Sequence, residues 1–324
     1  MPEKDAPIVS VCMITYNHEP FIAQAIEGVL MQETDFPIEL VIGEDFSTDR
    51  TREICEYYAS ANPGVVRLLE RTSNLGMIPN FVDTLNHCRS IYVALCEGDD
   101  FWSDPNKLQM QVQFLEANPS YIGTCSNVKI WNEDLQTEIG QPRYVNYPEE
   151  VTFAFDDVLH KTMVYTPSAV FRNREIDLDL LKPEYVFGDV CLWLMLLDQG
   201  PIRFFNKKLA VYRVHSAGAT RTIDGFRFQD QMVSFLEEFD KRTGYRHTSS
   251  IRKRIKRAET LSILLHPRTS WSKKLITIFG YFSRSDERNI RELKKLFGYG
   301  FRPWIERISN FRKRLAISPL SGRA

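Results

Sequence analysis

The chain has 324 residues, more than one typical domain holds, so we expect one large core with an appended segment or a small second unit. Hydrophobic residues make up 43% of the chain and aromatic residues 12%, which excludes an intrinsically disordered protein. The formal net charge of −1 is the sum of two unlike parts. Residues 251–324 carry 19 basic and 5 acidic side chains, a net of +14, whereas residues 1–250 carry 22 basic and 37 acidic ones, a net of −15.

Membrane-spanning, secreted and zinc-binding proteins are disfavoured. No apolar run approaches the roughly 18 residues that a spanning helix needs, and the longest dense run, Val190 to Leu197, is less than half that length. The start, MPEKDAPIVS, lacks the basic and apolar regions of a secretory signal, so we expect a cytoplasmic protein. The six cysteines occur singly, without a C-x-x-C pair, and are predicted to be small buried hydrophobes.

The first hundred residues alternate short apolar runs with amphipathic stretches. This periodicity predicts strands at 8–15, 38–42, 65–69 and 92–96, and helices at 20–31, 49–61 and 80–89. Such alternation predicts βαβ units and a parallel sheet covered by helices on both faces.

The rest of the chain is expected to add a helix at 105–117, a strand at 122–131, a polar loop at 141–150 and a helix at 189–197. A pair of strands is predicted at 202–205 and 209–214. After about Phe226 the pattern is helical and charged, with no further strand. We therefore divide the chain into a sheet domain, 1–225, and a basic helical region, 226–324.

Parallel sheets bind ligands at the carboxyl ends of their strands, so the residues that follow each strand are the first candidates for a site. Neither G-x-G-x-x-G nor G-x-x-x-x-G-K-[ST] occurs, and a phosphate would need neutralising in another way. Carboxylates can do this through a divalent cation. The segment Glu97-Gly98-Asp99-Asp100 suits that task, because two acids two residues apart can point the same way and Gly98 allows a turn. The alternative is a helix cap with surface acids.

Six segments in order resemble the family 2 glycosyltransferases of the GT-A fold, over about residues 7–220. They are VSVCMITYNHEPFIAQAIEGVLMQ, ELVIGEDFSTDRTREI, NLGMIPNF, YVALCEGDDFWSDPNKLQMQVQFL, FGDVCLWLML and YRVHSAG. The resemblance implies an α/β fold with a Rossmann-like, mixed but mostly parallel sheet flanked by helices, plus a C-terminal helical segment. It further implies a catalytic domain over 1–225, with a nucleotide-sugar half at about 7–120 and an acceptor half at about 121–225, of the bacterial surface-polysaccharide type.

The nucleotide-sugar residues implied by the resemblance follow the first four predicted strands. Asp45, with Glu44 beside it, would contact base or ribose. Relatives usually have two aspartates followed by glycine, whereas this chain has Gly43-Glu44-Asp45-Phe46. Which carboxylate takes the role is therefore open, and a turn-capping Asp45 is the alternative. The full predicted set is Thr15, Tyr16, Asn17, Glu19, Glu44, Asp45, Asn74, Gly76, Glu97, Gly98 and Asp100, with Asn74 and Gly76 also explicable as turn residues.

The same resemblance implies a metal site and a catalytic base. Glu97-Gly98-Asp99 matches the D-x-D motif, which makes Asp99 a ligand of Mn²⁺ or Mg²⁺ and leaves Glu97 to touch ribose or a metal-bound water. His215 matches a position that approaches the metal or the diphosphate. Asp189, otherwise a helix N-cap, becomes the base of an inverting, single-displacement transfer. Relatives often carry a second acid before this base, where this chain has Gly188.

Two features are open to more than one interpretation. Trp102 either stacks on an acceptor sugar or packs at the edge of the sheet. The basic segments 251–257, 271–282 and 301–317 combine Lys and Arg with large apolar residues, which is typical of helices on an anionic membrane. They alternatively pack on the acidic body; nucleic-acid binding is supported by no module.

The expected function is a metal-dependent transfer of a sugar from a nucleotide-diphosphate donor, a UDP-sugar first, to a saccharide or lipid-linked acceptor. The protein would then be cytoplasmic, or peripheral on the inner face of the cell membrane. One alternative is a sugar-1-phosphate nucleotidyltransferase, although that class needs a glycine-rich basic loop where this chain has TYNHEP. The other is a catalytically degenerate nucleotide-sugar-binding or scaffold protein.

Overall fold

The computed structural model describes residues 6–140, 147–160, 164–216, 218 and 224–283. The chain forms two compact units, Met1–Thr222 and Ile223–Ala324. The first unit holds one ten-stranded sheet whose main path runs β3-β2-β1-β4-β9-β6-β10-β5. Its first half consists of β1 (Val9–Thr15), α1 (Ile22–Leu30), β2 (Ile38–Glu44), α2 (Thr51–Ala61), β3 (Val66–Leu68), α3 (Met77–His87) and β4 (Tyr92–Leu95).

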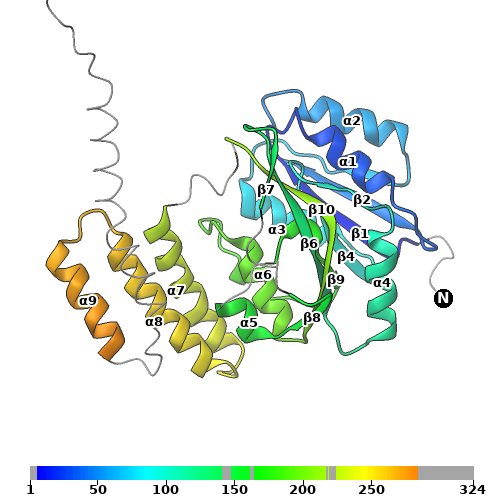
Figure 1. Cartoon of the computed structure of the whole chain (residues 1–324). Coiled ribbons are helices and arrows are strands. Elements are labelled where there is room, and N and C mark those ends of the chain that lie inside the picture. The colour runs from blue at the N-terminus through cyan, green and yellow to red at the C-terminus, as the bar shows by residue number, and fades with distance from the viewer. Residues whose placement is uncertain (1–5, 141–146, 161–163, 217, 219–223, 284–324) are drawn as a thin grey trace, which may run out of the picture. The chain divides into compact units, whose positions relative to one another are not determined.

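These elements follow from the hydrophobic pattern of the sequence. Six of the seven residues of β1 are buried, as expected for a strand covered on both faces. The buried face of α1 repeats at helical spacing, with Ile22, Ala25, Ile26 and Val29 all inaccessible to solvent. Strands β1, β2, β3 and β4 pair in parallel. Figure 1 shows α1, α2 and α4 on one face of the sheet, and α3, α5 and α6 on the other.

The second half of the unit makes the sheet mixed. It consists of β5 (Phe101–Trp102), α4 (Lys107–Ala117), β6 (Gly123–Asn132), β7 (Thr137–Ile139), β8 (Glu150–Phe153), α5 (Phe155–His160), β9 (Val170–Arg172), α6 (Gly188–Leu197) and β10 (Ile202–Val214). Strand β9 runs antiparallel between β4 and β6. Helix α6 buries apolar side chains around its whole circumference, which is typical of a helix inside a core. The expected mixed α/β sheet flanked by helices is confirmed.

Several predicted boundaries were wrong. The two strands predicted at 202–205 and 209–214 form the single strand β10, which stays paired with β6 through register shifts around Lys208. Helix α3 begins at Met77, three residues before the predicted start. Five elements were not predicted from the sequence, namely β5, β7, β8, β9 and α5. Part of the predicted loop 141–150 lies outside the described residues, and its last residue begins β8. All six cysteines are free and buried, as predicted.

The second unit contains α7 (Gly225–Arg242), α8 (Thr248–Leu265) and α9 (Trp271–Ser283) in its described part. Helices α7 and α8 pack together, and Leu261 and Leu264 of α8 form a core with Ile278 of α9. Helical structure after Phe226 is thus confirmed for the described residues. The segment 301–317 lies outside them. Among the described helices, none is both long enough and apolar enough to cross a membrane.

Candidate functional site

The loops after β1, β2 and β4 lie against one another at the carboxyl edge of the sheet. The Asp45 amide donates to the Thr15 carbonyl at 2.9 Å, and the Gly98 amide donates to the Ile14 carbonyl at 2.9 Å. A Cβ atom on Gly98 would lie 2.4 Å from Oγ1 of Thr15, a distance that atoms cannot tolerate. Glycine at 98 therefore allows the acidic loop to close on the end of β1.

Three carboxylates gather in that acidic loop. Glu97, Asp99 and Asp100 each offer one oxygen atom, and these oxygens lie within 4.8 Å of one another. Hard divalent cations prefer such oxygen ligands. Asp100 is fully buried, and its Oδ2 atom has no hydrogen-bond partner among the described residues. The residues present therefore fit a bound Mn²⁺ or Mg²⁺.

Two histidines face Asp99. His215 Nε2 lies 3.1 Å from Asp99 Oδ2, and His18 Nε2 lies 3.8 Å from the same oxygen. Burial by itself would raise the pKa of Asp99, but the hydrogen bond with His215 and the nearby His18 outweigh it and lower that pKa. Asp99 is thus held as a carboxylate, the form that a metal ligand must have.

The pairing of β5 with β10 brings His215 to the acidic loop. Val211 of β10 pairs with Phe101, directly after the acids, so the end of β10 runs alongside them. The Arg213 amide donates to Asp100 Oδ1 at 2.7 Å, and its guanidinium donates to the Asp99 carbonyl at 2.7 Å. Arg213 thereby fixes the backbone of the loop from which the carboxylates project.

Asp189 lies in the first turn of α6, whose N-cap is Phe187, so the interpretation of Asp189 as the helix N-cap was wrong. Burial raises the pKa of Asp189, against the backbone hydrogen bonds of the helix start. Burial, together with the charges of Asp99 and Asp189, raises the pKa of Glu97 from 4.5 to about 8, although a hydrogen bond from the Thr166 side chain opposes the rise. Glu97 therefore lies within electrostatic reach of both acids.

The two acids after β2 have protein partners. Asp45 accepts hydrogen bonds from the Leu75 and Gly76 amides at 2.7 and 2.9 Å, and Asn74 Nδ2 donates to the Asp45 carbonyl. Glu44 accepts from the Ser47 amide at 2.7 Å. Both acids are buried. Asp45 therefore ties the end of β2 to the loop that contains Asn74 and Gly76, and Glu44 is the acid that bonds the local turn at Ser47.

The residues after β1 also make hydrogen bonds within the protein, except for the exposed Tyr16 side chain. Asn17 accepts a hydrogen bond from the Thr48 amide, and Glu19 accepts one from the Arg50 amide at the start of α2. Thr15 is buried, with Oγ1 at 3.2 Å from His18 Nδ1. Tyr16 alone of the four is an exposed large side chain. These polar groups hold the β1 and β2 loops together beneath the exposed Tyr16.

Trp102 and Gly188 both lie in packed surroundings. The Trp102 indole N–H donates to the Pro167 carbonyl at 2.8 Å, and Lys107 Nζ covers the ring at 4.1 Å from its centroid. This burial favours packing over a sugar contact. A Cβ on Gly188 would lie 2.5 Å from the Ile78 Cδ1 atom, so Ile78 fills the space in which relatives carry a second acid.

Three residues of this site were not predicted from the sequence: His18, Thr166 and Arg213. His18 stands within a segment already singled out by its place after β1. Arg213 is two residues before His215, and the two-residue period of a strand indicates that both point to the same side. No sequence signal marks Thr166, which reaches Glu97 from a 3₁₀ turn.

Comparison with known proteins decides the family. Residues 10–180, more than half of the chain, match the family described as Glycosyl transferase family 2. The chain belongs to this family. The family 2 resemblance of the six sequence segments is thus confirmed.

Relatives of this family 2 member include bacterial proteins. An uncharacterized protein of Mycobacterium tuberculosis is 34% identical over 210 residues, which are 65% of this chain and 60% of the relative. The chain therefore matches less than two thirds of that relative's length. TuaG of Bacillus subtilis, provisionally named a teichuronic acid biosynthesis glycosyltransferase, is 27% identical over 212 residues, or 64% of this chain and 79% of TuaG.

Two solved structures share the fold at low identity. Residues 1–349 of Staphylococcus aureus TarS, in complex with UDP-GlcNAc, superpose with a TM-score of 0.58 at 16% identity, covering 90% of each chain. The mannosyltransferase PcManGT from Pyrobaculum calidifontis, in complex with GDP-Man and Mn²⁺, superposes with a TM-score of 0.54 at 18% identity, covering 93% of this chain and 83% of PcManGT.

Proposed function

We propose that this protein is an inverting, metal-dependent glycosyltransferase that moves a sugar from a nucleotide-diphosphate donor to a saccharide or lipid-linked acceptor. The observation that carries the proposal is the Glu97–Asp99–Asp100 cluster, whose carboxylate oxygens lie within 4.8 Å of one another and beside which His215 Nε2 lies 3.1 Å from Asp99 Oδ2. The charge of Asp189 raises the pKa of Glu97 in this cluster. We therefore assign Asp189 as the proton acceptor for a site that suits a cation and a diphosphate.

The surroundings of each carboxylate suggest its role, either as a proton acceptor or as a metal ligand. Asp189 takes the proton of the attacking acceptor hydroxyl, and burial suits it to this role because it raises the pKa of the carboxyl toward the working pH. Asp99, Asp100 and His215 would hold a divalent cation, which supplies positive charge against the departing diphosphate. Arg213 holds the acidic loop in place by donating hydrogen bonds to the Asp100 carboxylate and the Asp99 carbonyl.

The direct test is a transfer assay with UDP-, GDP- and dTDP-sugars in the presence of Mn²⁺, Mg²⁺ or a chelator. A thermal-shift panel with the same donors identifies the nucleotide first, because a ligand that binds only the folded state raises its apparent stability. The anomeric configuration of the product, measured by NMR, decides between inversion and retention. Loss of activity with the chelator is expected; donor binding without hydrolysis or transfer under any condition would indicate the degenerate, binding-only alternative.

A lipid-linked acceptor would place this protein at the inner face of the cell membrane. The described part of the basic region contains an amphipathic surface on α9, where Trp271, Ile276 and Phe279 are exposed beside the exposed Lys273. Apolar side chains flanked by lysine are typical of helices that lie in an anionic membrane surface. We refer to Trp271, Lys273, Ile276 and Phe279 as the α9 surface.

A further inference from the structure

Phe46 has an unfavourable backbone conformation that its neighbours impose. Its φ angle is +60°, in the left-handed region of the backbone that residues other than glycine and asparagine rarely adopt. The residue directly follows Asp45 at the end of β2, and its side chain is 53% exposed. The strain is therefore not compensated by burial of the ring in the core. An energetic cost of this kind, at the edge of a sheet where ligands bind, points to a functional use of the side chain.

Hydrogen bonds on both sides of Phe46 determine this conformation. On one side, the Asp45 carboxylate accepts from the Leu75 and Gly76 amides. On the other side, the Ser47 amide donates to Glu44, and Ser47 Oγ accepts from the Asn17 amide at 2.9 Å. Phe46 thus lies between residues that tie the β2 loop to the loops after β1 and β3.

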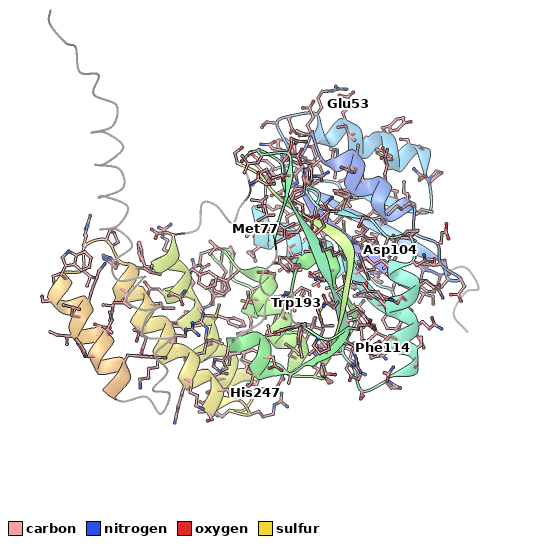
Figure 2. All side chains as sticks on the ribbon, viewed as in Figure 1. Glu53, Met77, Asp104, Phe114, Trp193 and His247 are labelled. Carbon is pink, nitrogen blue, oxygen red and sulfur yellow. The ribbon has the colours of Figure 1, made fainter. Side chains whose placement is uncertain are left out.

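Other exposed apolar side chains occur in the loops that are hydrogen-bonded to the β2 loop and at the start of α3. Tyr16 precedes Asn17, Leu75 follows the Asn74 that donates to Asp45, and Met77 begins α3. Each is exposed, and Figure 2 shows Met77 at the end of α3. They extend from the loops after β1, β2 and β3, which are neighbours in the sheet. We call Tyr16, Phe46, Leu75 and Met77 the apolar rim.

The apolar rim lies to one side of the acidic loop. Strand β2 is separated from β4 by β1 alone, so the two strand ends are about 10 Å apart at the usual strand spacing. A nucleoside diphosphate spans a comparable length, with a flat apolar base at one end and charged phosphates at the other. We propose that Phe46 is the stacking platform for the nucleobase of the donor, an assignment that rests on the proposed function.

Stacking on an aromatic ring depends little on which base is bound, since every base presents a π-face. Phe46 would therefore strengthen the binding of uridine and guanosine nucleotides alike, and selection of the base would fall to polar groups around it. The carboxylates of Glu44 and Asp45 already accept backbone hydrogen bonds. We therefore expect the aromatic ring of Phe46 to contribute more to nucleobase binding than these two carboxylates do.

The test compares the wild type with Phe46→Asn by titration calorimetry, in the presence of Mn²⁺. Asparagine tolerates the left-handed conformation, so this variant keeps the turn and removes only the ring. We expect its Kd for UDP and for GDP to rise about 10-fold and its Kd for inorganic pyrophosphate, which has no base, to stay unchanged. Phe46→Trp should restore nucleotide affinity. Tyr57→Ala, which removes an exposed aromatic ring from α2, is the matched control and should change neither value.

The outcomes separate this assignment from the proposed function. Equal affinities of the wild type and Phe46→Asn for UDP and GDP would overturn the stacking role and leave the proposed function standing. Equal weakening of nucleotide and pyrophosphate would also overturn it, because the loss would then not pass through the base. A wild type that binds no nucleotide would overturn both. Melting temperatures check the fold: Phe46→Asn should melt no lower than the wild type, because the strain is relieved.

Discussion

His215 Nε2 lies 3.1 Å from Asp99 Oδ2, although the two residues are 116 positions apart in the chain. The contact depends on β5 and β10 pairing directly beside the acidic loop. It joins a borderline imidazole nitrogen to a cluster of hard oxygen ligands. Mixed sets of this kind suit Mn²⁺ better than Mg²⁺, because imidazole is a ligand of transition metals.

His215→Gln should therefore weaken Mn²⁺ binding more than Mg²⁺ binding. We expect Kd for Mn²⁺ to rise roughly 10-fold or more, by analogy with the loss of groups that orient metal ligands. Electron paramagnetic resonance of free Mn²⁺ measures this without any donor. His87→Gln on α3, where the histidine faces Asp83, is the control and should bind as the wild type does. An unchanged Kd for Mn²⁺ in His215→Gln would remove this histidine from the metal site.

The stability of the metal-free protein should fall as the pH rises from about 5 to 8. The pKa of Glu97 is raised from 4.5 to about 8 by burial and by Asp99 and Asp189. Between pH 4.5 and about 8, Glu97 holds a proton in the folded state that it has released in the unfolded state. The free energy of unfolding is therefore highest below pH 4.5, the unfolded pKa, and decreases as the pH rises toward the folded pKa of about 8. Glu97→Gln removes this loss of stability and should be on the order of 4 kcal/mol more stable than the wild type at pH 8, with a much smaller difference at pH 5.

Denaturant unfolding at both pH values, with a chelator present, measures the effect of Glu97→Gln. Glu70→Gln, at an exposed position, serves as the control. Added Mn²⁺ should reduce the difference at pH 8, because a cation held by Asp99, Asp100 and His215 would favour the ionised form of the neighbouring Glu97. A Glu97→Gln variant with the wild type's pH dependence would contradict the electrostatic picture of the acidic loop.

The strand-end rule located the acidic loop and the end of β10 from the sequence, because βαβ alternation places successive strand ends on one edge. It could not foresee the contact between His215 and Asp99. That contact requires β9, whose three residues Val170–Arg172 are too few to show a period, to enter the sheet between β4 and β6. Strand β10 was divided in two because Asn206, Lys207 and Lys208 interrupt the apolar pattern. Their polarity marks an irregular pairing with β6 and not a turn.

The partners of the β2 acids were equally hidden. The sequence places Glu44 and Asp45 at the edge of the sheet, but the amides that satisfy Asp45 belong to a loop about 30 residues further on. Backbone amides are present at every position except proline, so no residue type signals such a contact.

Asp189→Asn should lower kcat by about 10²- to 10⁴-fold, the usual contribution of a general base, while the Kd for the nucleotide donor stays within about twofold of the wild-type value. Asparagine keeps the size of the side chain in the first turn of α6 and removes a charge that burial disfavours, so the variant should fold. Asp198→Asn, at the other end of α6 and about 15 Å away along the helix axis, is the matched control and should retain full activity. Transfer by Asp189→Asn at the wild-type rate would exclude Asp189 as the base.

The α9 surface should bind anionic vesicles. Ile276→Ser with Phe279→Ser removes two exposed apolar side chains from α9 but leaves Lys273 and the core residue Ile278 in place. Sedimentation with vesicles of 30% phosphatidylglycerol should show full-length wild type in the pellet and the double variant shifted to the supernatant. The loss should be roughly 10-fold in partitioning, because each buried apolar side chain contributes about 1–2 kcal/mol, reduced here by shallow insertion.

Leu135→Ser, at an exposed position of the first unit, controls for loss of surface hydrophobicity in general. Pure phosphatidylcholine should bind the wild type weakly, since lysine and arginine contribute through anionic headgroups. Equal sedimentation of the wild type and the double variant would instead favour packing of the basic region on protein.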